Sequence, residues 1–142
     1  MSDAAPIERP PQRIIAVWKG EESFDTSKLG GPVSLIDGHG VTGQGPVDTL
    51  LSALGTCSAM DVVNILAKQR TPVSSLEVEV VGTRENASPR RLKHALLIFR
   101  ISGAGIEREQ ALKAIALSVT KYCSVRDSLD PKIPVEWELE LK

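Results

Sequence analysis

The chain has 142 residues, of which 42% are hydrophobic and 25% charged, and its formal net charge at pH 7 is -1. These values are typical of soluble globular domains and exclude a wholly disordered chain. A near-zero net charge lacks the basic excess that phosphate binding needs, so we expect no nucleic-acid partner. The length predicts a single domain, or one subunit of a small oligomer.

Residues 1–12 contain three prolines, and we predict that they form a flexible N-terminal arm. We expect the domain to occupy residues 13–142. Short β-branched and aromatic segments then predict three strands, at residues 13–19, 23–26 and 33–36. The glycine-rich stretch that follows, residues 37–45, is predicted to be a loop. No Lys-Ser/Thr pair follows this loop, so it does not match a phosphate-binding loop.

A long helix is predicted between Pro46 and Pro72, because proline suits a helix start and Asp48 lies in the first turn. Apolar residues occur around almost its whole circumference, so the helix needs cover on every side. Frequent polar residues argue against a membrane span. A dimer interface would provide the cover. We expect Gly55 to mark a break that leaves Cys57 near the start of a second helical segment.

The second half of the chain alternates between strand and helix patterns. Period-two alternation predicts strands at residues 76–84, 92–102 and 133–141, the first two forming an antiparallel hairpin. Period 3.6 predicts a helix at residues 107–121. The predicted order is therefore βββ-α-ββ-α-β, an α+β fold with mainly antiparallel pairing.

Two cysteines, Cys57 and Cys123, lie 66 positions apart. This spacing excludes a CxxC redox motif, and with only two histidines in the chain it disfavours a zinc site. Two cysteines do not form a disulfide scaffold, and residues 1–13 lack the apolar core of a signal peptide, so we expect a cytoplasmic protein. From the residues alone the thiols are either inert core residues or a redox pair.

The segment GPVDTLLSALGTCSAMDVVNIL, with KYCSV further along, resembles the family of osmotically inducible protein C and organic hydroperoxide resistance protein (OsmC/Ohr), in particular a less-studied OsmC-like subgroup. The resemblance extends from about residue 15 to the C-terminus. It implies an intertwined homodimer in which antiparallel sheets wrap two central buried helices. Such a dimer would account for a helix with no polar face.

The resemblance also implies a thiol peroxidase that needs no cofactor and no metal. Cys57 matches the peroxidatic cysteine, which attacks an organic hydroperoxide, and Cys123 matches the resolving cysteine, which closes an intramolecular disulfide. A dithiol, of lipoyl or small-thiol type, would reduce the pair again. An apolar pocket beside Cys57 would favour fatty or aryl hydroperoxides.

Asp48 is the third candidate catalytic residue. Better-known members carry a Glu directly after the motif proline, where this chain has Val47, and they use an arginine from an early loop that has no counterpart motif here. Asp48 would bind the activating cation, or it would only stabilise the helix start. Asp61 is expected to form an ion pair across a dimer, and Arg126 to be a surface charge. The alternative function is a non-catalytic dimer that binds a hydrophobic small molecule or senses redox state.

Overall fold

The computed structural model describes residues 5–142 and divides the chain into two compact units, one ending at Pro46 and the other spanning Val47–Lys142. Part of the predicted arm, residues 1–4, lies outside the described residues, and residues 5–13 contain no strand or helix. The prediction of one domain over residues 13–142 concerns how the two units associate, and it stays a prediction.

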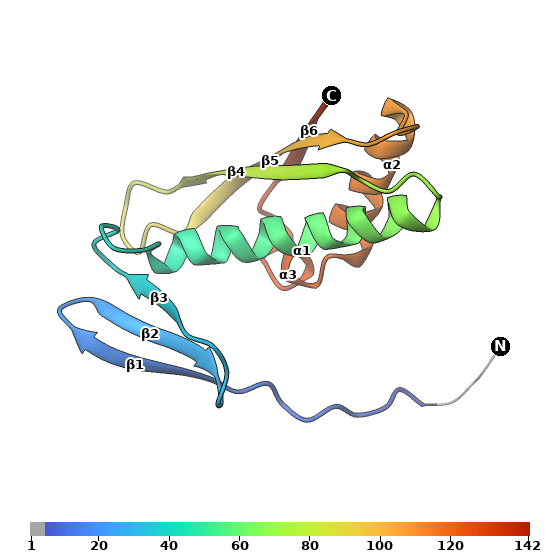
Figure 1. Cartoon of the computed structure of the whole chain (residues 1–142). Helices are drawn as coiled ribbons and strands as arrows, with labels where there is room; N and C mark the ends of the chain where they lie inside the picture. The colour runs from blue at the N-terminus through green and yellow to red at the C-terminus, as the bar shows by residue number, and fades with distance from the viewer. Residues whose placement is uncertain (1–4) are drawn as a thin grey trace. The chain divides into compact units, whose positions relative to one another are not determined.

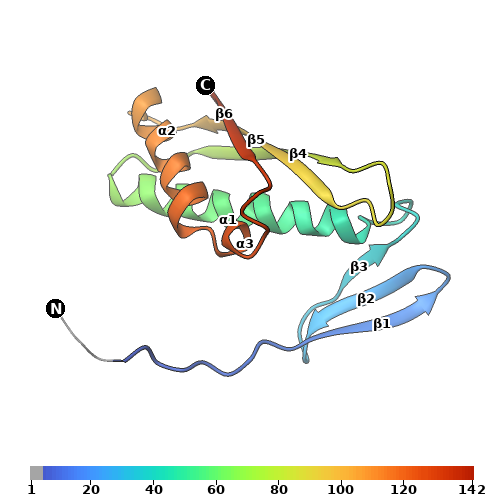
Figure 2. The ribbon, with the colours of Figure 1, turned by 180° about the vertical axis from the view of Figure 1, so that it is seen from behind.

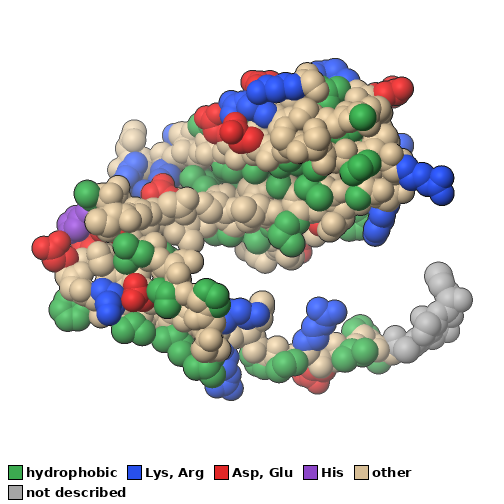
Figure 3. Space-filling view, viewed as in Figure 1, with side chains coloured by type: hydrophobic (Ala, Val, Ile, Leu, Met, Phe, Trp, Pro, Cys, Tyr) green, Lys and Arg blue, Asp and Glu red, His purple; other side chains and the backbone are tan. Residues whose placement is uncertain are grey.

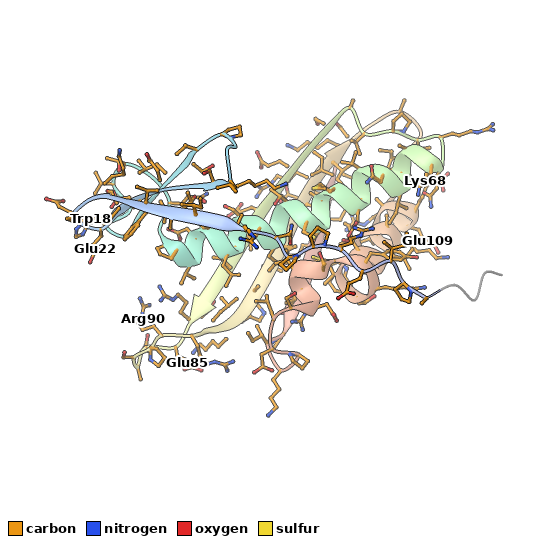
Figure 4. The ribbon with its side chains drawn as sticks, turned by 90° about the horizontal axis from the view of Figure 1, so that it is seen from below. Trp18, Glu22, Lys68, Glu85, Arg90 and Glu109 are labelled. Atoms are coloured by element: carbon orange, nitrogen blue, oxygen red, sulfur yellow. The ribbon has the colours of Figure 1, made fainter. Side chains whose placement is uncertain are left out.

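The first unit is a three-stranded antiparallel sheet in the order β1-β2-β3 (Figure 1). Its strands are β1 (Ile14–Gly20), β2 (Ser23–Lys28) and β3 (Ser34–Asp37), close to the predicted bounds. Trp18 and Glu22 lie at the β1–β2 turn (Figure 4). The loop after β3 is organised by the Asp37 carboxylate, which accepts hydrogen bonds from the backbone N–H groups of His39, Val41 and Thr42.

The second unit places helices on one face of the sheet β4-β5-β6 (Figures 1 and 2). The elements are α1 (Pro46–Lys68), β4 (Ser75–Arg84), β5 (Leu92–Ser102), α2 (Arg108–Leu117), the π-helical turn η1 (Ser118–Tyr122), α3 (Ser124–Asp127) and β6 (Val135–Leu141). The β4–β5 pair is the predicted antiparallel hairpin, whereas β6 pairs with β5 in parallel. A parallel neighbour needs a crossover connection, and α2, η1 and α3 supply it. The predicted α+β class is confirmed.

The core of the second unit lies between α1, α2 and the inner sheet face. Phe99, Leu97 and Ile101 alternate along β5 and are fully buried, and they pack with α1 and α2 side chains. From α1 the core receives a single stripe of buried residues spaced four apart, Leu54, Ser58, Val62 and Leu66. The opposite side of α1 is not covered by the described residues of the second unit, so hydrophobic side chains gather along this helix at the surface of that unit (Figure 3).

The predicted break at Gly55 is wrong, because α1 is continuous from Pro46 to Lys68. Gly55 is buried, and a Cβ atom built on it would lie 2.7 Å from Cγ2 of Val80 on β4. The glycine is therefore required for close helix–sheet packing. By length and composition alone, α1 is long and apolar enough to cross a membrane. The core helix of a soluble protein meets the same criterion.

Candidate redox site

Cys57 lies in the middle of α1, beside the buried stripe of that helix, and its side chain is half-buried. Helical spacing places Cys57 and Asp61 on neighbouring turns of one face, next to the fully buried Ser58 and Val62. The cysteine therefore stands at the edge of the core, where one side of the thiol meets protein and the other remains accessible.

Cys123 is held at a sharp change of backbone direction between η1 and α3. Its backbone is extended, with φ -72° and ψ 104°, and it serves as the N-cap of α3. The Cys123 sulfur accepts hydrogen bonds from the backbone N–H of Arg126 at 3.3 Å and from the Ser58 hydroxyl at 3.4 Å. Only 3% of the residue is exposed, so the thiol is fixed in position.

The structure brings the two cysteines together although 66 positions separate them. The two thiols are close enough for each to shift the pKa of the other, and both are free rather than joined in a disulfide. The Cys57 sulfur also lies 3.8 Å from the hydroxyl oxygen of Ser124, the first residue of α3. The site thus consists of two adjacent thiols at the start of a helical turn.

The two thiols differ in acidity because their surroundings differ. Partial burial alone would raise the pKa of Cys57, but the hydrogen bonds that it accepts outweigh this and lower the pKa. The donors are the backbone N–H groups of Val125 and Ser124, the Ser124 hydroxyl and the Cys123 thiol. Burial raises the pKa of Cys123, and the neighbouring Cys57 adds to the effect. Cys57 is therefore the more acidic of the two thiols.

A buried polar network fixes the residues behind the thiols. The Ser118 hydroxyl lies 2.8 Å from a carboxylate oxygen of Asp61, to which it donates, and 3.1 Å from the Ser58 carbonyl oxygen. The backbone N–H of Cys123 donates to the Ser118 carbonyl at 2.8 Å, the bond that closes the π-helical turn. Within the chain Asp61 therefore has a hydroxyl partner. Its predicted ion pair across a dimer stays a prediction.

Arg126 is more than the solvated surface charge that we predicted. Its guanidinium donates to the carbonyl oxygens of Asp130 at 3.2 Å, Pro131 at 3.5 Å and Ile133 at 2.8 Å. The side chain thereby ties the segment after α3 to the helical turn that carries Cys123. Of Arg126, only the backbone N–H donates to the Cys123 sulfur itself, at 3.3 Å.

Asp48 lies in the first turn of α1 and is exposed. Nine residues separate it from Cys57, which corresponds to about 14 Å along an α-helix and to the opposite helical face. That Asp48 binds the cation that activates Cys57 therefore stays a prediction. Such a cation would have to act over the distance between Asp48 and Cys57. His39, in the loop after β3, is exposed and forms an ion pair with Glu22 at 3.6 Å.

A shallow apolar hollow of about 330 Å³ lies along the uncovered face of α1, lined by Thr56, Ala59, Met60, Val63 and Asn64. Met60 and Asn64 are three and seven residues after Cys57 and so share its side of the helix. Among residues 5–142 no group of three His, Cys, Asp or Glu side chains is placed to hold a metal ion.

Three serines of the site were not predicted from the sequence. The hydroxyls of Ser58 and Ser124 contact the sulfurs, whereas the hydroxyl of Ser118 contacts Asp61. A signal existed for Ser58, because it is the polar member of an otherwise apolar stripe with helical spacing. No signal existed for the backbone N–H groups of α3, since a four-residue helix leaves little pattern in a sequence.

An α+β fold that brings two distant cysteines into one site makes this a small thiol protein. The family model of the OsmC-like proteins matches residues 38–138. YhfA of Escherichia coli K12 is 33% identical over 125 residues, which is 87% of this chain and 93% of YhfA. The chain therefore belongs to the OsmC family.

Solved structures agree with this assignment. A hypothetical protein from Aquifex aeolicus is 24% identical, with a TM-score of 0.80 and coverage of 94% of this chain and 99% of that one. The organic hydroperoxide resistance protein OhrB of Bacillus subtilis is 16% identical, with a TM-score of 0.59 and coverage of 93% and 98%. At these identities the likeness shows a common fold, and the family fold is consistent with a redox function.

Proposed function

We propose that the protein is a thiol-dependent peroxidase that reduces organic hydroperoxides through Cys57 and Cys123. The observation that carries this proposal is that two free cysteines meet in one site, where the Cys57 sulfur lies 3.8 Å from the hydroxyl oxygen of Ser124, the residue after Cys123. The lowered pKa of Cys57 supports it. Membership of a family that includes organic hydroperoxide resistance proteins supports the same activity.

The reaction begins with the Cys57 thiolate, which attacks the terminal oxygen of the hydroperoxide. The O–O bond breaks, the alkoxide takes a proton to leave as the alcohol, and Cys57 becomes a sulfenic acid. The Cys123 thiol then attacks the Cys57 sulfur, so that the S–S bond forms and water leaves. A dithiol returns both cysteines to the reduced state and is itself oxidised to a disulfide.

The hydrogen bonds to Cys57 determine how this reaction starts. Donors at Ser124 and Val125 stabilise the thiolate without a formal positive charge. The hollow on the open side of α1 is predominantly apolar, which favours the organic part of a fatty or aryl hydroperoxide over hydrogen peroxide.

The proposal includes a cytoplasmic homodimer. The uncovered side of α1 carries Leu50, Met60 and Val63 at 36%, 64% and 37% exposure, an unusual density of apolar side chains for the open face of one helix. A second copy on this face would bury these side chains and would convert the shallow hollow into an enclosed binding site.

One observation favours the alternative, a dimer that binds a hydrophobic molecule or senses redox state without turnover. The interactions that shift the pKa of Cys57 are burial and hydrogen bonds, and no side-chain cation from residues 5–142 is among them. A thiolate without a cation is less strongly activated, which suits a slow sensor.

The decisive experiment treats the reduced protein with cumene hydroperoxide and follows free thiols and intact mass. We expect loss of both thiols per chain and a mass decrease of two hydrogens, with one equivalent of alcohol formed. Cys57→Ser should lose no thiol, and Cys123→Ser should accumulate a sulfenic acid that dimedone traps at Cys57. Survival of the wild-type thiols in excess hydroperoxide would refute the peroxidase and leave the binding protein.

A further inference from the structure

Each cysteine of this chain is followed by a serine, and the fold crosses the two Cys-Ser pairs. Ser58 follows Cys57 in α1, and its hydroxyl donates to the sulfur of Cys123 at 3.4 Å. Ser124 follows Cys123, and its hydroxyl oxygen lies 3.8 Å from the sulfur of Cys57. Each serine therefore contacts the sulfur of the other cysteine rather than that of its own neighbour.

The burial of Ser58 shows that its contact with Cys123 is specific. Ser58 is the polar member of the buried stripe of α1, its neighbours in that stripe are leucine and valine, and none of its surface is exposed. A hydroxyl group buried among aliphatic side chains costs free energy unless it forms a hydrogen bond. The hydrogen bond to the Cys123 sulfur satisfies this hydroxyl in the core.

The backbone around Cys123 is held against the same turn of α1. The backbone N–H of Cys123 donates to the Ser118 carbonyl oxygen at 2.8 Å, and the Ser118 hydroxyl oxygen lies 3.1 Å from the Ser58 carbonyl oxygen. Ser58 and Ser118 are fully buried, and Cys123 is 3% exposed. The position of the Ser58 hydroxyl relative to the Cys123 sulfur is therefore fixed by several contacts.

The Cys123 sulfur depends on such donors when it carries negative charge. At 3% exposure it has almost no access to water, so hydrogen bonds from the protein have to stabilise a thiolate there. The backbone N–H of Arg126 supplies one of these bonds at 3.3 Å, and the Ser58 hydroxyl supplies another. Burial raises the pKa of the Cys123 thiol, and the hydrogen bond from Ser58 opposes that increase.

We propose that Ser58 is a catalytic residue of the step in which Cys123 forms the disulfide with Cys57, because its hydroxyl stabilises the negative charge on the attacking Cys123 sulfur. The inference rests on the proposed function, which supplies Cys57 as a sulfenic acid. The Cys123 thiol gives up its proton, its sulfur attacks the Cys57 sulfur, and the S–O bond breaks. The departing hydroxide takes up a proton and leaves as water. Ser58 keeps its own proton throughout.

The crossed arrangement divides the two chemical steps between the two serines. Ser124 contacts the sulfur that attacks first, and Ser58 contacts the sulfur that attacks second. Loss of either hydroxyl should therefore slow a different step. This separation is the property that the experiment measures.

The experiment uses dithiodipyridine, an aromatic disulfide that releases coloured thiopyridone when a thiolate attacks it. Cys57 is the less buried cysteine and should react first, which releases one thiopyridone and leaves a mixed disulfide. Cys123 then attacks the Cys57 sulfur, the bond to the reagent breaks, and a second thiopyridone leaves. The second phase is intramolecular, so its rate should not depend on reagent concentration, and Cys123→Ser should abolish it.

Ser58→Ala should slow the second phase relative to the first about tenfold at neutral pH, as expected for loss of a hydrogen bond to an ionised group. Ser124→Ala should slow chiefly the first phase. Ser52→Ala removes a hydroxyl from the same helix six residues before Ser58, and as the matched control it should leave both phases as in the wild type. A second phase that Ser58→Ala does not slow, or equal slowing of both phases, overturns the inference.

The pH dependence distinguishes charge stabilisation from packing. Without the Ser58 hydroxyl the Cys123 thiolate forms at higher pH, so the deficit of Ser58→Ala should shrink as the pH rises. Alanine favours helix, so this variant should keep α1 intact. Ser58→Thr keeps a hydroxyl but adds a methyl group to the core, and its second phase should be faster than that of Ser58→Ala. A deficit that is equal at every pH, or a slower second phase in Ser58→Thr, would show a packing role and overturn the inference.

The outcomes also separate this inference from the peroxidase, because the disulfide reagent takes the place of the hydroperoxide. If Ser58→Ala slows the second phase but the wild type does not reduce hydroperoxide, only the proposed function fails. If hydroperoxide is reduced and Ser58→Ala completes the second phase as fast as the wild type, only the inference fails. If the wild type releases a single thiopyridone, Cys123 does not attack Cys57, and both fail.

Discussion

The two units of the chain differ in where their hydrophobic side chains lie. In the part of the chain that the structure describes, every buried hydrophobic side chain belongs to the second unit, where β5 and the helices form a packed core. The first unit instead exposes large apolar side chains, among them Trp18 at 64% and Phe24 at 37%. A three-stranded sheet without a covered face is marginally stable by itself. The second unit therefore carries both the core and the two thiols, whereas the first needs cover from outside itself.

The largest effect that we expect comes from truncation of the core. Phe99→Ala removes a fully buried aromatic side chain and should lower the free energy of unfolding by about 3–5 kcal/mol, measured by urea denaturation. Phe24→Ala is the matched change in the first unit, and because Phe24 is 37% exposed it should cost clearly less. Equal losses for the two variants would show that the first unit is as well packed as the second.

The next effect tests what covers the exposed side of α1. Met60 is 64% exposed, so Met60→Lys should change the stability of an isolated chain by no more than about 0.5 kcal/mol. In a dimer that buries this face, an unpaired charge should raise the dissociation constant by about 100-fold or more. Sedimentation equilibrium distinguishes the two cases. Glu109→Lys, an exposed change on α2, should leave the dissociation constant unaltered, and a wild-type monomer at all concentrations would contradict the dimer.

A smaller effect concerns the contact between α1 and β4. In Gly55→Ala the new methyl group meets Cγ2 of Val80 at 2.7 Å, and overpacking of this kind costs about 1–3 kcal/mol. The gain in helix propensity, about 1 kcal/mol, offsets part of that cost. In a Val80→Ala background the clash disappears, so Gly55→Ala should become stabilising. Urea denaturation of the four proteins in this double-mutant cycle measures the effect of Gly55→Ala on the free energy of unfolding in both backgrounds. If that effect has the same sign in both, steric packing is not the reason for glycine at position 55.

Much of this fold could be predicted from the sequence, because the elements are long enough to show their period. The alternation in β4–β6 and the apolar α1 both identified secondary structure correctly. The prediction of a break at Gly55 was wrong, because a glycine within a helical sequence can mark either a hinge or a close contact with a neighbouring element. Only the position of the opposing strand distinguishes the two. Position 55 needs a glycine because of the close contact with Val80, which lies 25 positions further along the chain.

The site was less predictable than the fold. The spacing of Cys57 and Cys123 left inert and redox interpretations open, and only the family resemblance paired them. Their contact depends on the turn of η1 and on the extended backbone at Cys123, which are set by tertiary packing. The role of Arg126 was missed for the same reason, because its partners are backbone carbonyl oxygens that carry no sequence signal.

The smallest effect returns to the first unit, where the buried side chain is an acid rather than a hydrophobic residue. Asp37 is 3% exposed, and hydrogen bonds from Thr42, His39 and Val41 lower its pKa from 3.8 to about 2. Because the pKa is lower in the folded state, the charged form stabilises the fold above pH 3.8, and this contribution is lost as the pH falls toward 2.

Asp37→Asn removes the charge and with it this pH dependence. The Tm of the wild type should exceed that of the variant most clearly at pH 5 and above, and the difference should close between pH 3.8 and about 2. Thermal unfolding at a series of pH values measures it, with Asp25→Asn as a control, since Asp25 on β2 is paired with Lys19 at 3.9 Å at the surface. A Tm difference that stays constant down to pH 2 would mean that the Asp37 carboxylate is not what organises the loop.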